Sequence, residues 1–276
     1  MGAVDGLDLD WLGFCRRATE GGRRALARYP KTAERARRLG RGEGGDMTLA
    51  IDRAVEDAVF AELESLGVGL CALSEERGLV AIAGGGPVCV VIDPIDGSLN
   101  AKRGLPLYSL SIAVAGGDDM AAVEFAYVAD LSSGEEWWAH RGEGAWFDGE
   151  RLEPGEADAQ LEILGVESAD PRRVAAAGGA LAETEAHRLR MIGSIALSLC
   201  YVASARFDGM LSLRVARSVD AAAGQLIVVE AGGSVAFPDV AGEAVPLDLG
   251  MRSRVVAGAT PRILDGLLAA TRKIQP

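Results

Sequence analysis

Hydrophobic and polar positions along the chain follow two kinds of pattern, one typical of helices and one typical of strands. Residues 8–29 and 51–66 are amphipathic, and in the second segment Val55, Val59 and Leu63 step by four along one face, which predicts a helix. The intervening residues 35–46 are basic and glycine-rich without apolar periodicity, and they predict a mobile loop. Short apolar runs then predict strands at 69–74, 88–92, 109–115 and 121–129, followed by a hairpin of 136–141 and 145–147.

The second half of the chain alternates strands with helices. Strands are predicted at 161–166, 189–192, 209–213, 234–237 and 254–257, and helices at 171–183, 194–205, 218–230 and 261–271. Such interleaving favours a layered α/β sandwich. A polar, turn-rich stretch at 149–159 separates the halves, so we expect one unit over residues 1–276 with an N-terminal half, 1–150, and a C-terminal half, 151–276.

The run Val88–Ile92 is followed by two carboxylates three positions apart, Asp93 and Asp96. Apolar, β-branched runs of this kind are typical of strands buried on both faces, so their ends are where loops meet solvent. Pro94 and Gly97 favour a sharp turn at this point. Two acids, the intervening Ile95 carbonyl and the following Ser98 hydroxyl would converge on a small volume, an arrangement suited to a hard divalent cation and a phosphate.

Composition narrows the function. The 276 residues carry 28 basic and 40 acidic side chains, a net charge of −12, which argues against nucleic-acid or anionic-membrane partners. Four isolated cysteines (Cys15, Cys71, Cys89 and Cys200) form no CxxC pair and predict reduced thiols, and two histidines argue against a His-rich zinc site. Neither a signal peptide nor a span of membrane-crossing length is predicted, so we expect a cytoplasmic protein.

Further acids follow the same rule of lying at the ends of elements. Glu75 and Glu76 follow an apolar strand, Asp220 opens a helical run, and Asp46 and Asp52 bracket Met47 and Thr48. Each has an ordinary interpretation: a lone Glu-Glu pair is usually solvated surface, and Asp220 could be a helix cap. Asp93-Pro94 could likewise be a simple turn, although a turn does not require two acids directly after an apolar strand.

Three motifs in order resemble the inositol monophosphatase family. Residues 93–100 (DPIDGSLN) resemble its signature D-P-[LI]-D-G-[TS]-x-N, residues 74–76 (SEE) its upstream acidic pair, and residues 219–233 (VDAAAG…EAGG) its C-terminal signature W-D-x-A-A-G…E-A-G-G. The resemblance covers nearly the whole chain. It implies a layered αβαβα sandwich, a Mg²⁺-dependent phosphomonoester hydrolase and a homodimer.

The resemblance also assigns metal ligands. Two or three Mg²⁺ ions would offset the negative charge of the clustered acids and of the phosphate. The first ion would be held by Glu75, Asp93 and the carbonyl of Ile95, and the second by Asp93, Asp96 and Asp220. A third, weaker ion would be brought from the glycine-rich loop by Asp46 with Thr48.

Catalytic and substrate roles follow from the same resemblance. Glu75 and the Ser98 hydroxyl would orient the attacking water, and the amides of Gly97 and Ser98 would bind phosphate oxygens. Substrate hydroxyls would meet the turn that precedes a predicted helix, formed by Gly193, Ser194, Ile195 and Ala196. The substrate is therefore expected to be a small phosphorylated polyol or sugar.

The chain departs from the family at two places. The family's usual Trp before Asp220 is Val219, a change expected to alter packing rather than chemistry. Where animal inositol monophosphatases carry an acid seven positions before that Asp, this chain has Leu213, followed by Arg214 and Arg217. This pattern is similar to archaeal members that also hydrolyse fructose 1,6-bisphosphate, and an Arg suits a second phosphate better than a neutral hydroxyl.

Several alternatives stay open at this point. Within the enzyme class these are fructose 1,6-bisphosphatase, alone or as a dual activity, and nucleotide 3′-phosphatase, whose family members are usually longer. Outside it are an inactive metal- or polyol-binding homologue and a regulatory subunit that acts by dimerisation.

Overall fold

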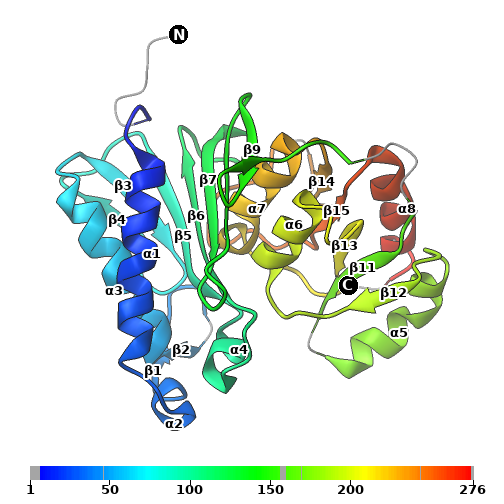
Figure 1. Ribbon diagram of the computed structural model, residues 1–276, viewed down its shortest axis with the longest axis horizontal. Coiled ribbons are helices and arrows are strands. Elements are labelled where there is room, and N and C mark those ends of the chain that lie inside the picture. The colour runs from blue at the N-terminus through cyan, green and yellow to red at the C-terminus, as the bar shows by residue number, and fades with distance from the viewer. Residues whose placement is uncertain (1–6, 46, 156–159, 169, 243, 275–276) are drawn as a thin grey trace.

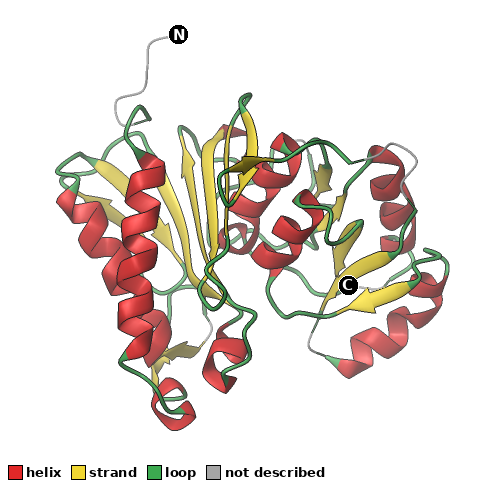
Figure 2. Ribbon diagram, in the orientation of Figure 1, coloured by secondary structure: helices red, strands yellow, loops and turns green. Residues whose placement is uncertain are grey.

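Two β-sheets alternate with three layers of helices (Figure 1, Figure 2). The structure is a computed structural model that describes residues 7–45, 47–155, 160–168, 170–242 and 244–274. From one side to the other, α1 (Trp11–Ala27) and α3 (Ala50–Ser65) cover the outer face of the larger sheet, and α6 (Ile195–Ala203) and α7 (Ser218–Glu230) lie between the sheets. The helices α5 (Pro171–Ala182) and α8 (Pro261–Thr271) cover the smaller sheet. The predicted αβαβα layering is confirmed.

The larger sheet has eight strands in the order β10-β9-β8-β7-β6-β5-β3-β4. β3 and β5 are parallel, and every other neighbouring pair is antiparallel. In chain order the strands are β3 (Leu70–Ser74), β4 (Gly78–Ile82), β5 (Cys89–Asp96), β6 (Ser109–Ala115), β7 (Val123–Asp130), β8 (Glu136–His140), β9 (Gly144–Phe147) and β10 (Glu150–Arg151).

The smaller sheet has five strands in the order β12-β11-β13-β15-β14. They are β11 (Ile163–Glu167), β12 (Arg188–Arg190), β13 (Gly209–Ser212), β14 (Ser234–Ala236) and β15 (Val256–Gly258). β12, β11 and β13 run parallel to one another, whereas β15 is antiparallel to both of its neighbours. This sheet lies wholly after β10 (Glu150–Arg151), the last strand of the larger sheet.

Three apolar clusters hold the layers together. One packs α1 and α3 against the larger sheet, where Phe14, Val55 and Leu63 are fully buried. The second is shared by the larger sheet, α6, α7 and the smaller sheet, and the third lies under α5 and α8. Truncating a buried Leu in such a core costs about 2–5 kcal/mol. The middle cluster joins both halves of the chain, which fixes the position of α7 against β5, β6 and β7.

Several element boundaries differ from the predictions, each for a local reason. α1 begins only at Trp11 because the Asp10 side chain caps it, accepting from Gly13 N at 2.8 Å. β7 begins at Val123 because residues 120–122 form a 3₁₀ turn, η1, capped by Asp119. α6 begins at Ile195 because Ser194 is its cap, and β15 lies two residues later than predicted.

The prediction of a loop over residues 35–46 is wrong in part. The segment starts with the last residue of a short helix, α2 (Thr32–Arg35), and contains β1 (Arg38–Arg41), which pairs with β2 (Met47–Leu49) in a two-stranded hairpin. The edge strand β4 also carries too little periodicity to be predicted as an element, and a short helix, α4 (Ser98–Arg103), begins directly after Gly97.

Candidate metal and phosphate site

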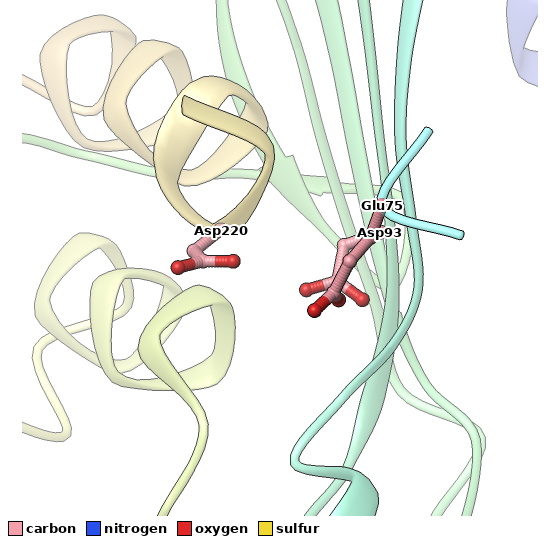
Figure 3. A group of neighbouring side chains, drawn as sticks. All are labelled: Glu75, Asp93 and Asp220. Carbon is pink, nitrogen blue, oxygen red and sulfur yellow. The ribbon is translucent and has the colours of Figure 1, made fainter. Parts of the chain in front are cut away.

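Three carboxylates from separate elements meet between the two sheets. Glu75 follows β3, Asp93 lies in β5 and Asp220 lies in the first turn of α7, and one oxygen of each lies within 4.8 Å of the others. Figure 3 shows the three side chains pointing into a common space, with Asp220 opposite the other two. They line a cavity of about 520 Å³ that is also lined by Asp96, Ile95, Gly97 and Ser98. The predicted acids therefore converge, although they are 145 residues apart at the extremes, from 75 to 220.

A β-bulge brings Asp93 and Asp96 to the same cavity. Side chains three positions apart in a regular strand point to opposite faces. Here the pairing with β6 moves from Asp93↔Ser111 to Asp96↔Ser109, so one extra residue is inserted in β5. Because of that extra residue, both carboxylates point to the same face of the sheet. The strand therefore continues through the acids instead of ending at Ile92, as the apolar run predicted.

Asp220 is both a helix cap and a member of the cluster. Its Oδ2 accepts from the backbone N–H of Arg217 at 2.8 Å, which satisfies a free donor at the start of α7. The two interpretations weighed from sequence are therefore compatible. The cap fixes the direction of the carboxylate, and the packing of α7 against β5 to β7 places it opposite Asp93.

The clustered carboxylates are costly to ionise together. Burial, and then Glu75, Asp96 and Asp220, raises the pKa of Asp93 well above its usual range. Burial and then Asp220 raise the pKa of Glu75 to about 8 and that of Asp96 to about 7. A cation held among these oxygens would favour their ionised forms. An all-oxygen donor set with this much negative charge fits a hard divalent ion such as Mg²⁺.

Asp96 joins the cluster to the turn predicted to bind substrate. Its Oδ2 accepts from Ser194 Oγ at 2.7 Å and from Ala196 N at 2.6 Å. Ile195 lines the same cavity as the carboxylates. The structure thus brings together the predicted residues Asp96, Ser194, Ile195 and Ala196.

Gly97 and Ser98 form the turn after β5. Gly97 has a φ of +93°, and a Cβ there would lie 2.8 Å from Leu107 O, so only glycine fits. The Ser98 hydroxyl donates to the Ile95 carbonyl at 2.8 Å. A carbonyl has two lone pairs, so this bond leaves one for a cation. The Asn100 amide donates to Leu107 O at 2.8 Å and to Ile192 O at 2.6 Å, tying α4 to the Gly193 turn.

Of the two loop residues predicted to act together, Asp46 lies outside the described residues. Thr48 is buried, and its hydroxyl donates a hydrogen bond to the Glu76 carboxylate. The hairpin loop packs directly on the acidic pair: Gly44 N donates to Glu75 O at 2.8 Å, and a Cβ on Gly42 would lie 2.3 Å from Glu76 Oε2. Close approach to the acids therefore explains Gly42 and Gly44.

Sequence reasoning missed Asp52, which lines the same cavity. One of its oxygens accepts from Leu49 N at 2.8 Å, and the other has no hydrogen-bond partner among the described residues. Burial raises the pKa of Asp52 to about 7, opposed by the Leu49 amide and by the nearby Ser98 hydroxyl. From sequence, Asp52 stands out only as one of the two acids that flank Met47 and Thr48. Its place in the first turn of a helix directly after a short strand was the available signal.

Glu167 was also missed, although it too ends an apolar strand. It is buried, lines the cavity, and accepts from Gly193 N at 2.9 Å and from Ser198 Oγ at 2.6 Å. Burial raises its pKa to about 7. Glu167 therefore holds the Gly193 turn against α6, behind the residues that contact Asp96.

Arginines line the other side of the site. The predicted Arg214 is exposed and lines both the carboxylate cavity and an adjoining cavity of about 850 Å³, which also contains Arg173 and Arg252. Leu213 is buried in the core under α5 and α8. Arg217, noted only as a neighbour from sequence, forms an ion pair with Glu75.

The layered fold and its cluster of carboxylates define the class: an αβαβα protein with an acidic, all-oxygen centre that could hold a cation. The family model of the inositol monophosphatase family matches residues 15–276. A fructose-1,6-bisphosphatase/inositol-1-monophosphatase of Archaeoglobus fulgidus is 34% identical over 252 residues, covering 88% of this chain and 92% of that protein. An inositol-1-monophosphatase of Mesorhizobium japonicum is 35% identical over 235 residues, covering 83% and 84%.

The solved structures agree on the fold. A crystal structure described as an inositol monophosphatase-fructose 1,6 bisphosphatase superposes with a TM-score of 0.79 at 22% identity, covering 95% of this chain and all of that one (100%). The chain belongs to the inositol monophosphatase family. The predictions of the family, of the fold and of a phosphatase are confirmed.

Proposed function

We propose that this protein is a Mg²⁺-dependent phosphomonoester hydrolase acting on inositol monophosphate and related small sugar phosphates. The observation that carries the proposal is the convergence of Glu75, Asp93 and Asp220, with their oxygens within 4.8 Å, beside Asp96 and the Ser98 turn. The two relatives described above are named for the same activities.

The carboxylates are the proposed metal ligands. Glu75, Asp93 and the Ile95 carbonyl would hold one ion, and Asp93, Asp96 and Asp220 a second. When bound, such ions neutralise the phosphate and lower the pKa of a bound water. Asp46 with Thr48 remains a proposal for a third ion.

The remaining groups would bind the substrate and orient the attacking water. The amides of Gly97 and Ser98 would donate to phosphate oxygens, and Ser98 with Glu75 would orient the attacking water. Asp52 has one oxygen without a hydrogen-bond partner among the described residues and a pKa raised by burial to about 7, so it would accept a proton in this cavity near neutral pH. The turn of Ser194, Ile195 and Ala196 would contact the substrate hydroxyls.

Fructose 1,6-bisphosphate is a second proposed substrate. The arginine-lined cavity adjoins the carboxylate cavity, and the two share lining residues that include Arg214, Arg217 and Asp220. Arginine binds phosphate through paired hydrogen bonds, so a second phosphate would find Arg214, Arg173 and Arg252 there. The Archaeoglobus relative is named for both activities.

Three further proposals concern the whole protein. Residues 1–276 would act as a single phosphatase unit, because one core cluster joins both halves. The protein is expected to be a homodimer and cytoplasmic. Among the described residues, no helix is both long and apolar enough to cross a membrane.

A substrate panel tests the function. Phosphate release from myo-inositol 1-phosphate, fructose 1,6-bisphosphate and adenosine 3′,5′-bisphosphate is measured with Mg²⁺ and with EDTA. We expect Mg²⁺-dependent release from the first two and little from the third. Arg214→Met should lower kcat/KM for the bisphosphate more than for the monophosphate. Equal release in EDTA would contradict the proposal, and no release from either sugar phosphate would contradict the substrate class.

A further inference from the structure

The guanidinium of Arg217 lies inside the carboxylate site. Its Nη1 forms an ion pair and hydrogen bond with Oε1 of Glu75, and the Arg217 side chain is only 10% exposed. Arg217 also precedes α7, so its backbone N–H is the group that Asp220 caps. One residue therefore contacts two of the three clustered acids.

The pair is enclosed by the glycine-rich loop. Gly44 donates its N–H to Glu75 O at 2.8 Å, and a Cβ on Gly44 would lie 3.1 Å from Arg217 Nη1. Three separate elements, the end of β3, the β1–β2 loop and the start of α7, thus hold the Arg217–Glu75 pair in place. Because the pair is largely enclosed, water screens it less than a surface ion pair, and removing Arg217 would leave the Glu75 charge buried without this partner.

The charge of Arg217 opposes the repulsion among the acids. Burial and Asp220 raise the pKa of Glu75, and the positive charge and hydrogen bond of Arg217 act against that rise. Arg217 thus supplies, from the protein itself, the positive charge that a divalent ion would supply. The same Glu75 oxygen is occupied by the guanidinium, and two cations close together repel each other.

We propose that Arg217 is an internal counter-ion that competes with the metal ion for Glu75. It stabilises the metal-free protein, and metal binding displaces it from Glu75. Arg217 lines both cavities together with Arg214, so the adjoining cavity offers room for the displaced guanidinium. The metal part of this inference rests on the proposed function.

Competition has a definite thermodynamic consequence. If the Arg217–Glu75 pair forms only in the metal-free protein, removing it destabilises that state and tightens metal binding together. A residue that instead helped to orient Glu75 for the metal would give the opposite sign for affinity. The two measurements together therefore separate competition from a merely structural role.

The experiment uses the full-length protein and its Arg217→Met variant, which keeps an apolar stem without charge. Mn²⁺ binding is followed by the loss of the free-ion electron paramagnetic resonance signal, and Tm is measured in EDTA. We expect roughly tenfold tighter Mn²⁺ binding and a lower Tm in EDTA, with a larger rise in Tm on adding metal. Arg217→Lys, which keeps the charge, should stay closer to the parent in both Mn²⁺ affinity and Tm in EDTA.

Two controls locate the effect on the pair. Arg214→Met removes the same charge from an exposed neighbour in the same cavity and should change Mn²⁺ affinity less than about threefold. In a Glu75→Gln background, Arg217→Met should lower the Tm in EDTA by less than it does in the parent. If Arg217→Met does not fold without metal, two other measurements test the inference. These are the Mn²⁺ affinity and Tm of Arg217→Lys compared with the parent, and the recovery of folded Arg217→Met on adding Mn²⁺.

Weaker or unchanged Mn²⁺ affinity in Arg217→Met would overturn the inference while leaving the proposed function standing. If the parent binds no Mn²⁺, both fail, because the metal assignment itself is then wrong. Failure of the substrate panel with intact Mn²⁺ binding would affect the proposed function alone.

Discussion

Asp96 and Ser194, 98 residues apart in the chain, are joined by a 2.7 Å hydrogen bond across the space between the two sheets. Ser194 is at the same time the cap of α6, since its hydroxyl oxygen accepts from Leu197 N at 3.2 Å. The bond therefore couples a proposed metal ligand on β5 to the helix that presents the substrate turn.

Replacing Ser194 should affect both stability and substrate binding. Ser194→Ala removes a helix cap and a buried partner of Asp96, and we expect a loss of about 1–3 kcal/mol in the free energy of unfolding. KM should rise because the turn is no longer fixed. Denaturant unfolding and steady-state kinetics measure these effects. Ser65→Ala, on an exposed helix end, is the control and should change stability by less than about 0.5 kcal/mol; equal effects of the two would refute the coupling.

Gly97 and Gly104 flank α4 and form a matched pair. Both have a positive φ, +93° and +74°. A Cβ at Gly97 would lie 2.8 Å from Leu107 O, whereas a Cβ at Gly104 would have no heavy atom of the described residues within 4 Å. Gly104→Ala should therefore cost about 1 kcal/mol from backbone conformation alone. Gly97→Ala should cost more and should lower kcat, because the Ser98 turn must shift. Similar stability and similar kcat in the two variants would show that the turn tolerates a side chain.

Asp52 gives a prediction in which stability and activity change in opposite directions. Burial raises its folded-state pKa to about 7, above the unfolded value, so the folded protein holds more protons and loses stability as pH rises from about 4 through 7. Asp52→Asn keeps an acceptor for Leu49 N and removes the charge. In EDTA at pH 8 we expect a gain on the order of 2 kcal/mol, together with a fall in kcat of roughly 10²-fold. Urea unfolding and phosphate release at pH 8 test both; a less stable variant would show that the carboxylate is better accommodated than its burial implies.

Asp239 and Arg254 provide a pH test remote from the site. Arg254 donates to Asp239 Oδ1 at 2.7 Å and, through Nη1, to the carbonyls of Thr271 and Ile274 at 2.9 Å, anchoring the chain end after α8. Hydrogen bonds from Arg254 hold the pKa of Asp239 below its usual value. This contribution is present above the unfolded pKa and is lost as pH falls through the lower folded pKa.

Asp239→Asn should therefore lower the free energy of unfolding by about 2 kcal/mol at pH 7, and the difference from the parent should shrink at pH 3 and below. Unfolding in urea across this pH range gives the comparison. The exposed Asp118→Asn serves as the control for loss of one charge. A difference that stays constant with pH would mean that the carboxylate charge is not what stabilises the contact.

The elements with strong local signals were predictable. α8 has a Pro at its first position after the capping Thr260, α7 has Asp220 in its first turn, and the observed bounds of both match the predicted ones. By contrast, β12 is exposed along its whole length and β4 lies at an edge, so β12 was predicted with shifted bounds and β4 not at all. Short edge strands are defined by backbone pairing more than by side-chain pattern.

The candidate site was predictable where an acid directly follows an apolar run, as at Glu75 and Asp93. The bulge in β5 was not, because it depends on the register with β6. Asp52, Glu167 and Arg217 acquire their places only through packing between distant segments, such as the Arg217–Glu75 pair over 142 positions. A single sequence contains the residues of such contacts without showing which of them meet.

The carboxylates of Glu75, Asp93 and Asp220 are the proposed ligands of the ions that drive phosphate release, and Asp93 is the buried member of the group. The most direct measurement is the Mg²⁺ dependence of phosphate release from myo-inositol 1-phosphate by the parent and by Asp93→Asn, with Mn²⁺ binding measured on the same samples. We predict that the variant loses at least about 10²-fold in kcat and binds Mn²⁺ more weakly while remaining folded. Turnover within a few-fold of the parent, with unchanged Mn²⁺ binding, would contradict the account.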